Sequence, residues 1–265
     1  MRLALSVVPI VVFAAAASAQ AFEESPAVPE RLAPLSVKAR QRALPEDFSA
    51  VAKAAWEDSR PVAAASTRDL LAAVKAGQID TVKTLLNEGA LANGANELGE
   101  RPLLAAVAGE YAEIARLLIQ RGANPNVKGP EGRLPLAMAS AVGNLGIVRI
   151  LLQAGADVDA RSDNRATALH EAVRFDRPEI LRLLLSARPD PERYDREGLH
   201  PLALAAARGR LACLLVLLDS PVAADLPDRN GLTALYWARR YDQALAESLL
   251  VERGASREAW PINLD

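Results

Sequence analysis

A period of 33 residues is the feature of this sequence that most restricts its fold. Six leucines stand in register at that spacing with no insertion between them: Leu70, Leu103, Leu136, Leu169, Leu202 and Leu235. An alanine follows three positions after each of these anchor leucines, and a pair of aliphatic residues follows fifteen and sixteen positions after it. Periods of about 20 to 50 residues are typical of proteins built from stacked repeats. We therefore expect six similar units in this part of the chain.

Each period carries signals for one turn and two helices. Glycines such as Gly99 and Gly132 stand four residues before the anchor leucine, in polar stretches that favour turns. Gly77, Gly143 and Gly209 mark a second break, where the chain can reverse between the two helices. Because a single helix pair cannot cover its own apolar faces, the units must stack on one another. The sequence thus predicts an all-α solenoid.

Composition agrees with a helical protein. Alanine and leucine, two strong helix formers, account for 53 and 40 of the 265 residues, whereas only 11 residues are aromatic. A β-sandwich or barrel would need more β-branched and aromatic residues. The charges nearly cancel, with 31 basic and 33 acidic residues, so no chain-wide electrostatic surface for nucleic acid is expected.

Residues 1–19 are predicted to be an export signal. Met1 and Arg2 give a small positive start, an apolar stretch follows, and a small-residue cleavage site ends at Ala19. An uncleaved membrane anchor is the alternative interpretation. No cysteine lies near the cleavage site, which argues against a lipid anchor, and no stable membrane insertion is expected after cleavage. Because the alanine and arginine excess is typical of a GC-rich bacterium, this signal predicts a periplasmic protein, with secretion as the alternative.

The chain on either side of the repeats is expected to be less regular. Residues 20–66 form a proline-rich leader in which a helix is predicted at about 45–59, with its apolar stripe packed over the end of the following domain. Residues 257–265 form a short C-terminal tail.

A search for chemistry in the sequence is mostly negative. No motif for a nucleophile elbow, a phosphate-binding loop or a dinucleotide-binding turn is present, so we expect no enzymatic activity and no cofactor. One cysteine and two histidines are too few for a zinc site. Cys213 is interpreted as a small buried hydrophobic residue rather than a reactive thiol, and His170 and His200 as structural hydrogen-bonding residues.

The repeat units resemble ankyrin repeats. The segment from Gly132 to Asp157 is similar to the family pattern almost throughout. Residues 167–170, Thr-Ala-Leu-His, resemble the family's Thr-Pro-Leu-His tetrapeptide, and residues 101–103 and 200–202 keep its Pro-Leu half. The resemblance implies a β-turn and an antiparallel helix pair in each unit, a curved stack, and a role in binding other macromolecules without naming the partner.

The resemblance covers residues 67–256. The units expected are 67–95, 96–128, 129–161, 162–194, 195–227 and 228–256, numbered one to six below. Some positions depart from the pattern. Arg188 and Pro221 replace the glycine that ends the second helix, so we expect proline to end these helices and the two junctions to bend differently. Arg165 replaces a turn glycine, which puts the geometry of that loop in doubt.

In the ankyrin family, the turn tips and the exposed side of the first helix vary and contact the partner. Carried onto this sequence, those positions are small and apolar in the early units, but arginine and aromatic residues occupy them in units four to six. The candidate partner-binding residues are Arg174, Phe175, Arg196, Arg208, Arg229, Arg240 and Tyr241. Arginine and tyrosine are enriched at interface hot spots.

Our hypothesis is that these residues bind an acidic or carboxylate-bearing surface of another exported protein. A solvated polar face is the alternative, since residues 161–256 contain 14 acidic and 14 basic residues. The expected function is a non-enzymatic, monomeric interaction protein of the periplasm. A secreted effector or toxin-neutralising protein is the second candidate. An enzyme would need its chemistry in residues 20–66, which contain no histidine or cysteine.

Overall fold

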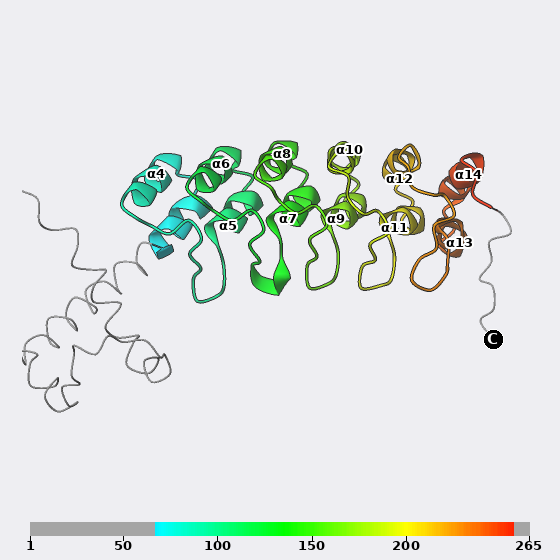
Figure 1. Cartoon of the computed structure of the whole chain (residues 1–265), viewed down its shortest axis with the longest axis horizontal. Coiled ribbons are helices and arrows are strands. Elements are labelled where there is room, and N and C mark those ends of the chain that lie inside the picture. The colour runs from blue at the N-terminus through cyan, green and yellow to red at the C-terminus, as the bar shows by residue number, and fades with distance from the viewer. Residues whose placement is uncertain (1–66, 257–265) are drawn as a thin grey trace, which may run out of the picture. The chain divides into compact units, whose positions relative to one another are not determined.

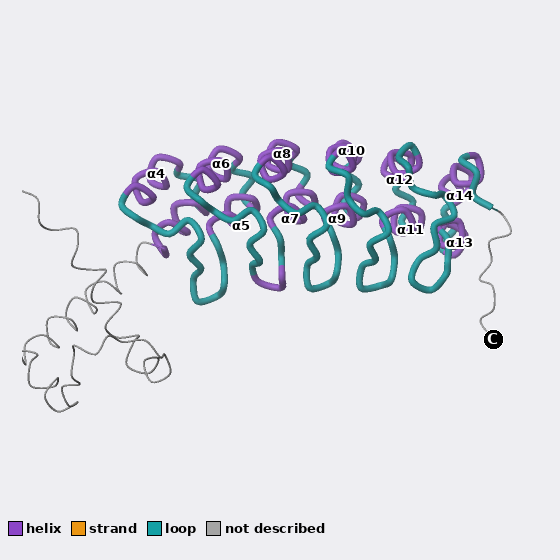
Figure 2. Tube along the Cα trace, in the orientation of Figure 1, coloured by secondary structure: helices purple, strands orange, loops and turns teal. Residues whose placement is uncertain are grey.

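The computed structural model describes residues 67–256, and it is all-helical over that range. The predicted signal, leader and tail, including the helix expected at 45–59, lie outside the described residues. Helix pairs follow one another in two layers, with the second helices forming the upper row of Figure 1, the first helices the row beneath, and the turns projecting below. Figure 2 shows no strand in the part of the chain that is described. The prediction of an all-α solenoid is confirmed.

The helices repeat with the period of the sequence. The first helices are residues 67–75, α5 (Pro102–Ala108), α7 (Pro135–Val142), α9 (Ala168–Arg174), α11 (Pro201–Ala207) and α13 (Ala234–Arg240). The second helices are α4 (Ile79–Asn87), α6 (Ala112–Gln120), α8 (Leu145–Gln153), α10 (Pro178–Ser186), α12 (Leu211–Leu218) and α14 (Ala244–Glu252). A short 3₁₀ helix, η1 (Pro130–Gly132), forms the turn before α7.

A left-handed residue reverses the chain between the two helices of every unit. Gly77, Gly143 and Gly209 have φ values of 68°, 101° and 60° at this position, as their sequence pattern predicts. In the intervening units the same position carries an acidic residue: Glu110, Asp176 and Asp242, with φ between 53° and 59°. Aspartate tolerates this conformation better than most residues that have a Cβ. The turn is therefore the same in all six units, although glycine marks only half of them.

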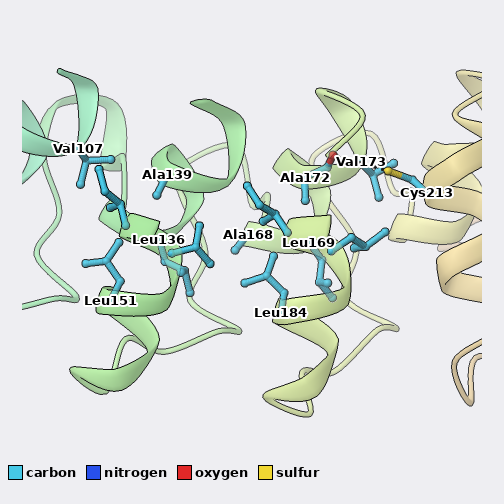
Figure 3. Close-up of a cluster of buried hydrophobic side chains, with 14 of the residues drawn as sticks. Val107, Leu136, Ala139, Leu151, Ala168, Leu169, Ala172, Val173, Leu184 and Cys213 are labelled. Atoms are coloured by element: carbon cyan, nitrogen blue, oxygen red, sulfur yellow. Dashed lines mark hydrogen bonds between the residues drawn. The ribbon is translucent and has the colours of Figure 1, made fainter. Parts of the chain in front are cut away.

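The anchor leucines form the centre of the core. All six are 0–3% exposed, and the alanines that follow them by three positions are 0–5% exposed. Figure 3 shows Leu136, Leu169 and Leu184 among the buried side chains between neighbouring units. Alanine has no side chain beyond Cβ, so neighbouring first helices can approach closely. Each unit consequently buries its apolar surface against the next, as expected for a solenoid.

A ladder of side-chain hydrogen bonds joins the loops that follow the second helices. Asn93 Oδ1 accepts from the backbone N–H of Asn124 at 2.7 Å, and Asn126 Oδ1 accepts from that of Asp157 at 2.7 Å. The carboxylates of Asp159 and Asp225 repeat the bond to residues 190 and 256. Glu192 stands at the equivalent position between units four and five, but no such bond is found there within residues 67–256. One rung of the ladder is missing.

The expectation that proline ends the helices of units four and five is wrong for unit four. Arg188 itself adopts the left-handed conformation with φ 55°, so α10 ends as if a glycine were present. In unit five Pro221 cannot adopt positive φ, and α12 ends at Leu218, one residue before the position equivalent to the end of α10. Arg165 likewise adopts φ 62°, so the turn of unit four keeps the conformation of the glycine turns.

Restoring the missing rung is expected to stabilise the stack. Glu192→Asp shortens the side chain to match Asp159 and Asp225, so that its carboxylate can accept from the N–H of Ala223. A hydrogen bond to a charged group should raise the free energy of unfolding by about 1 kcal/mol, measured by urea denaturation. The converse change, Asp159→Glu, should lower it by a similar amount. Equal stability of both variants and the parent would show that the ladder contributes nothing.

Candidate functional site: the turn face

The turn tips and the exposed side of the first helices form one surface, here called the turn face. Buried aspartates shape the later tips: Asp195 Oδ1 accepts from two backbone N–H groups of its own turn, and Asp228 Oδ1 does the same one unit later. Adjacent tips are also bonded to each other, since the N–H of Arg196 donates to Asn164 and that of Arg229 to Gly198. The tips of units four to six therefore form a continuous, ordered edge.

Three of the predicted partner-binding residues lie around one cavity. Arg174, Phe175 and Arg196 line a cavity of about 540 Å³ together with residues of units three and four, among them Met138 and Asp163. Both the tips and the helix positions five and six past the anchor leucine thus face the same space. Phe175 is 50% exposed, which leaves its ring available for contact.

Arg174 is less available than its sequence position suggests. Its guanidinium donates to Glu171 at 2.8 Å and lies 3.6 Å from the buried carboxylate of Asp195. Burial raises the pKa of Glu171, and the attraction of Arg174 and Arg208 opposes that rise. Arg208 is therefore close enough to act on the same carboxyl group. Arg174 serves the internal network, whereas Arg208 stays exposed beside it.

The other predicted arginines are exposed. Arg196, Arg208, Arg229 and Arg240 form no ion pair with any described residue. Arg208, Arg229, Arg240 and Tyr241 do not line the 540 Å³ cavity. They occupy the same repeat positions in units five and six as the cavity residues do in unit four, so they extend the turn face toward its C-terminal end.

An aromatic pair lies at that end. The Tyr241 ring stacks on Trp237 with centroids 5.9 Å apart and planes 15° from parallel, and Tyr241 is 53% exposed. The indole N–H of Trp237 donates to Asp228 Oδ2 at 2.8 Å, which holds the stack against its turn. Sequence reasoning missed Trp237. It stands two residues past the anchor leucine, and the helical spacing of three to four residues to Arg240 and Tyr241 would have placed it on the same face.

The equal number of acids and bases in residues 161–256 hides a local excess of positive charge. On the turn face of units four to six three acids are used within the fold, whereas Asp163 and Glu197 are exposed at the tips and form no ion pair with any described residue. Asp195 and Asp228 are 3% and 4% exposed and hold their turns, and Glu171 is paired with Arg174. Arg196, Arg208, Arg229 and Arg240 form no such ion pair within residues 67–256. The four unpaired arginines outnumber these two exposed acids, so the net charge presented to a partner is positive.

A second cavity of about 360 Å³ lies on the turn face of units one to three. Its floor is apolar, with Leu104, Ala105 and Ala108 from α5 and Met138 from α7. Arg133 and Met138 line both cavities. The two hollows are therefore neighbours along the same face.

The two histidines are structural, as predicted. His170 Nδ1 accepts from the N–H of Thr167, and its Nε2 lies 3.0 Å from the carbonyl of Leu199 in the next unit. His200 stands at the position equivalent to Thr167: its Nδ1 accepts from the N–H of Ala203, and its Nε2 lies 3.0 Å from the carbonyl of Leu226 in the same unit. Burial lowers the pKa of both side chains, for His170 to about 4. Both act in the neutral form: His170 joins units four and five, and His200 joins the first helix of unit five to the loop that follows its second helix.

Cys213 is buried, in agreement with its interpretation as a small hydrophobic residue. Burial, together with the neighbouring Asp176, raises the pKa of its thiol to about 12, so the thiolate needed for reactivity is suppressed. Residues 67–256 contain no cluster of three or more potential ligands that could hold a metal ion. None of the helices described there has the length and apolar character needed to cross a bilayer.

Comparison with known proteins agrees with this architecture. The family model described as Ankyrin repeats (3 copies) matches residues 69–129, 125–195 and 169–258. The ankyrin repeat domain of Bcl-3, a member of the IkappaB family, is 28% identical with a TM-score of 0.67, over 71% of this chain and 86% of that one. An ankyrin repeat domain from Acinetobacter baumannii AYE is also 28% identical, with a TM-score of 0.66 over 71% and 98%.

No significant match was found among curated proteins. The family model nevertheless spans nearly the whole described region, and the solved structures share its fold. Ankyrin repeats in general are non-enzymatic modules that bind other proteins. From its period, its stacked helix pairs and these matches, the chain belongs to the ankyrin-repeat family.

Proposed function

We propose that this protein is a non-enzymatic interaction module of the bacterial periplasm that binds an acidic partner protein through the turn face of units four to six. The observation that carries the proposal is the group of exposed arginines without ion pairs, Arg196, Arg208, Arg229 and Arg240, beside the Trp237–Tyr241 stack. Arginine forks bind carboxylates in a bidentate manner. Aromatic rings beside them supply apolar contact area.

The periplasmic location rests on the predicted signal at residues 1–19. A secreted effector or toxin-neutralising protein would use the same scaffold and the same signal. Cell fractionation separates the two: retention in the periplasm under all growth conditions supports the first function, and release into the medium supports the second.

Charge reversal of two exposed arginines tests the site. In Arg208→Glu/Arg240→Glu, repulsion should replace two attractive contacts, and we expect capture of the partner from a periplasmic extract to fall at least about tenfold. Both side chains point to solvent, so the helical circular dichroism spectrum should be unchanged.

The matched control is Arg149→Glu/Arg182→Glu. It changes the net charge equally, and both arginines are exposed on second helices, away from the turn face. This variant should capture as much of the partner protein as the parent does. If the first double variant still captures the same proteins, the site lies elsewhere.

A further inference from the structure

The two cavities of the turn face adjoin each other and are together called the groove here. The 360 Å³ cavity begins at Lys75 in unit one, and the 540 Å³ cavity ends at Arg196 on the tip of unit five. Arg133 and Met138 of unit three belong to both. The two cavities therefore meet at unit three.

Charges at the early end of the groove are already satisfied within the protein. Lys75 binds both carboxylate oxygens of Glu100 at 2.8 Å, and Arg133 pairs with Glu131 at 2.6 Å. The Arg101 guanidinium donates to two backbone carbonyls, those of Asn93 and Lys128. What this end offers a ligand is the apolar floor of Leu104, Ala105, Ala108 and Met138.

The late end of the groove has the opposite character. Arg196 lies at its margin, and the equally unpaired Arg208, Arg229 and Arg240 continue beyond it, with no ion-pair partner in the described range. The aromatic floor there is Phe175, followed by the Trp237–Tyr241 stack. The 540 Å³ cavity itself is lined by three acids and three bases, and the excess of positive charge lies with the unpaired arginines beyond it. The turn face therefore changes from apolar at its early end to basic and aromatic at its late end.

We infer that the partner enters this groove as one extended segment with an apolar block over units two and three and an acidic block over units five and six. Cavities of about 540 and 360 Å³ have room for several side chains. An extended chain can place side chains in both cavities with few residues between them. The inference deepens the proposed function and rests on it, because it assigns the acidic contact to one half of a longer ligand.

The repeat spacing sets the distance between the blocks. Met138 of unit three and Arg208 of unit five are two repeats apart, which corresponds to about 20 Å at the usual distance between packed helices. An extended chain advances about 3.3 Å per residue, so about six residues separate the block centres. A polyanion such as a nucleic acid fits less well, since its charge would be uncompensated over the apolar half.

Synthetic peptides labelled with fluorescein test the inference directly. Each carries a Leu-Pro-Leu block and a Glu-Glu-Glu block whose centres are about six residues apart in a Gly/Ser spacer, and both chain orders are made. Binding to the purified full-length protein is followed by fluorescence polarisation at low salt. One order should bind at least about tenfold more tightly than the acidic block alone. A spacer too short to bring the two blocks over their sites should abolish that gain.

Two single variants assign the halves. Ala108→Glu places a charge on the exposed apolar floor and should remove the gain from the Leu-Pro-Leu block while leaving binding of the acidic block unchanged. Arg240→Glu should weaken every peptide that carries the acidic block. Circular dichroism confirms that both variants are folded.

The outcomes distinguish a failure of this inference from a failure of the proposed function. If the acidic block alone binds as well as the two-block peptides, or if spacer length has no effect, the inference is overturned and the acidic site stands. If no peptide binds and charge reversal at Arg208 and Arg240 leaves partner capture unchanged, both the inference and the proposed function are overturned. Strong binding of a labelled oligonucleotide that Ala108→Glu does not affect would also overturn it.

Discussion

Leu169→Ala is expected to lower the free energy of unfolding by about 2–5 kcal/mol. Leu169 is completely buried and lies in the middle of the stack, where Figure 3 shows it beside Ala168, Ala172 and Leu184. Truncation removes the transfer free energy of the side chain and leaves a cavity that the rigid helix pairs on both sides can only partly fill. Since single domains are stable by about 5–15 kcal/mol, this is a large fraction of the total.

Urea denaturation followed by circular dichroism at 222 nm measures the effect of Leu169→Ala. Leu245→Ala is the matched control, because Leu245 is 70% exposed and its truncation should change the free energy of unfolding by less than about 0.5 kcal/mol. Similar destabilisation by the two changes would contradict the central position assigned to the anchor leucine.

Acidification is expected to destabilise the stack through His170. The side chain has an ordinary pKa of 6.5, and burial lowers it to about 4 in the folded protein. Between these pH values the unfolded chain binds a proton that the folded chain does not, so the free energy of unfolding falls as pH decreases. The stabilisation is fully present above pH 6.5 and is lost progressively toward pH 4, by up to about 3 kcal/mol.

The hydrogen bonds of His170 explain why the neutral form is required. Nδ1 accepts from the Thr167 N–H, so a proton added there would face another donor. Urea denaturation at pH 7.5 and pH 4.5 should show the loss, and His170→Asn should be less stable than the parent at pH 7.5 but show a smaller difference between the two pH values. Burial also lowers the pKa of His200, so part of the pH dependence should persist in this variant. An unchanged pH dependence in His170→Asn would exclude His170 as its source.

The repeat fold could be predicted from the sequence because the same constraint recurs six times. Any unit with a poor motif is placed by its neighbours, as with unit four, where Arg165 and Arg188 simply adopt the backbone conformation that glycine adopts elsewhere. Glu110 could not be recognised in this way. Its left-handed conformation follows from the fold of the unit rather than from its own preference, so the residue type gave no signal.

The candidate site was harder to predict, because exposure and pairing depend on contacts between units. Arg174 and Arg240 occupy equivalent positions in the period, yet only Arg174 has Glu171 and Asp195 as neighbours. Asp195 belongs to the following unit, so no pattern within one unit reveals the pair. Trp237 was accessible to sequence reasoning through helical spacing, but its bond to Asp228 depends on a turn nine residues away.

Because the hydrogen bond to the side chain of residue 192 is missing, the two edges of the junction between units four and five are held by different sets of bonds. On the turn side, Arg196 bonds to Asn164, His170 to Leu199, and Arg174 lies beside Asp195. The loops after α10 and α12 lack the bond that residue 192 would accept, and the Tyr194 hydroxyl, which donates to the carbonyl of Pro227 at 3.4 Å, joins them instead. We expect this junction to bend more easily away from the turn face than toward it. Bending there would move the loops after α10 and α12 apart and change the curvature of the turn face. The stack would then fit partners of different shape while the contacts in its core stay intact.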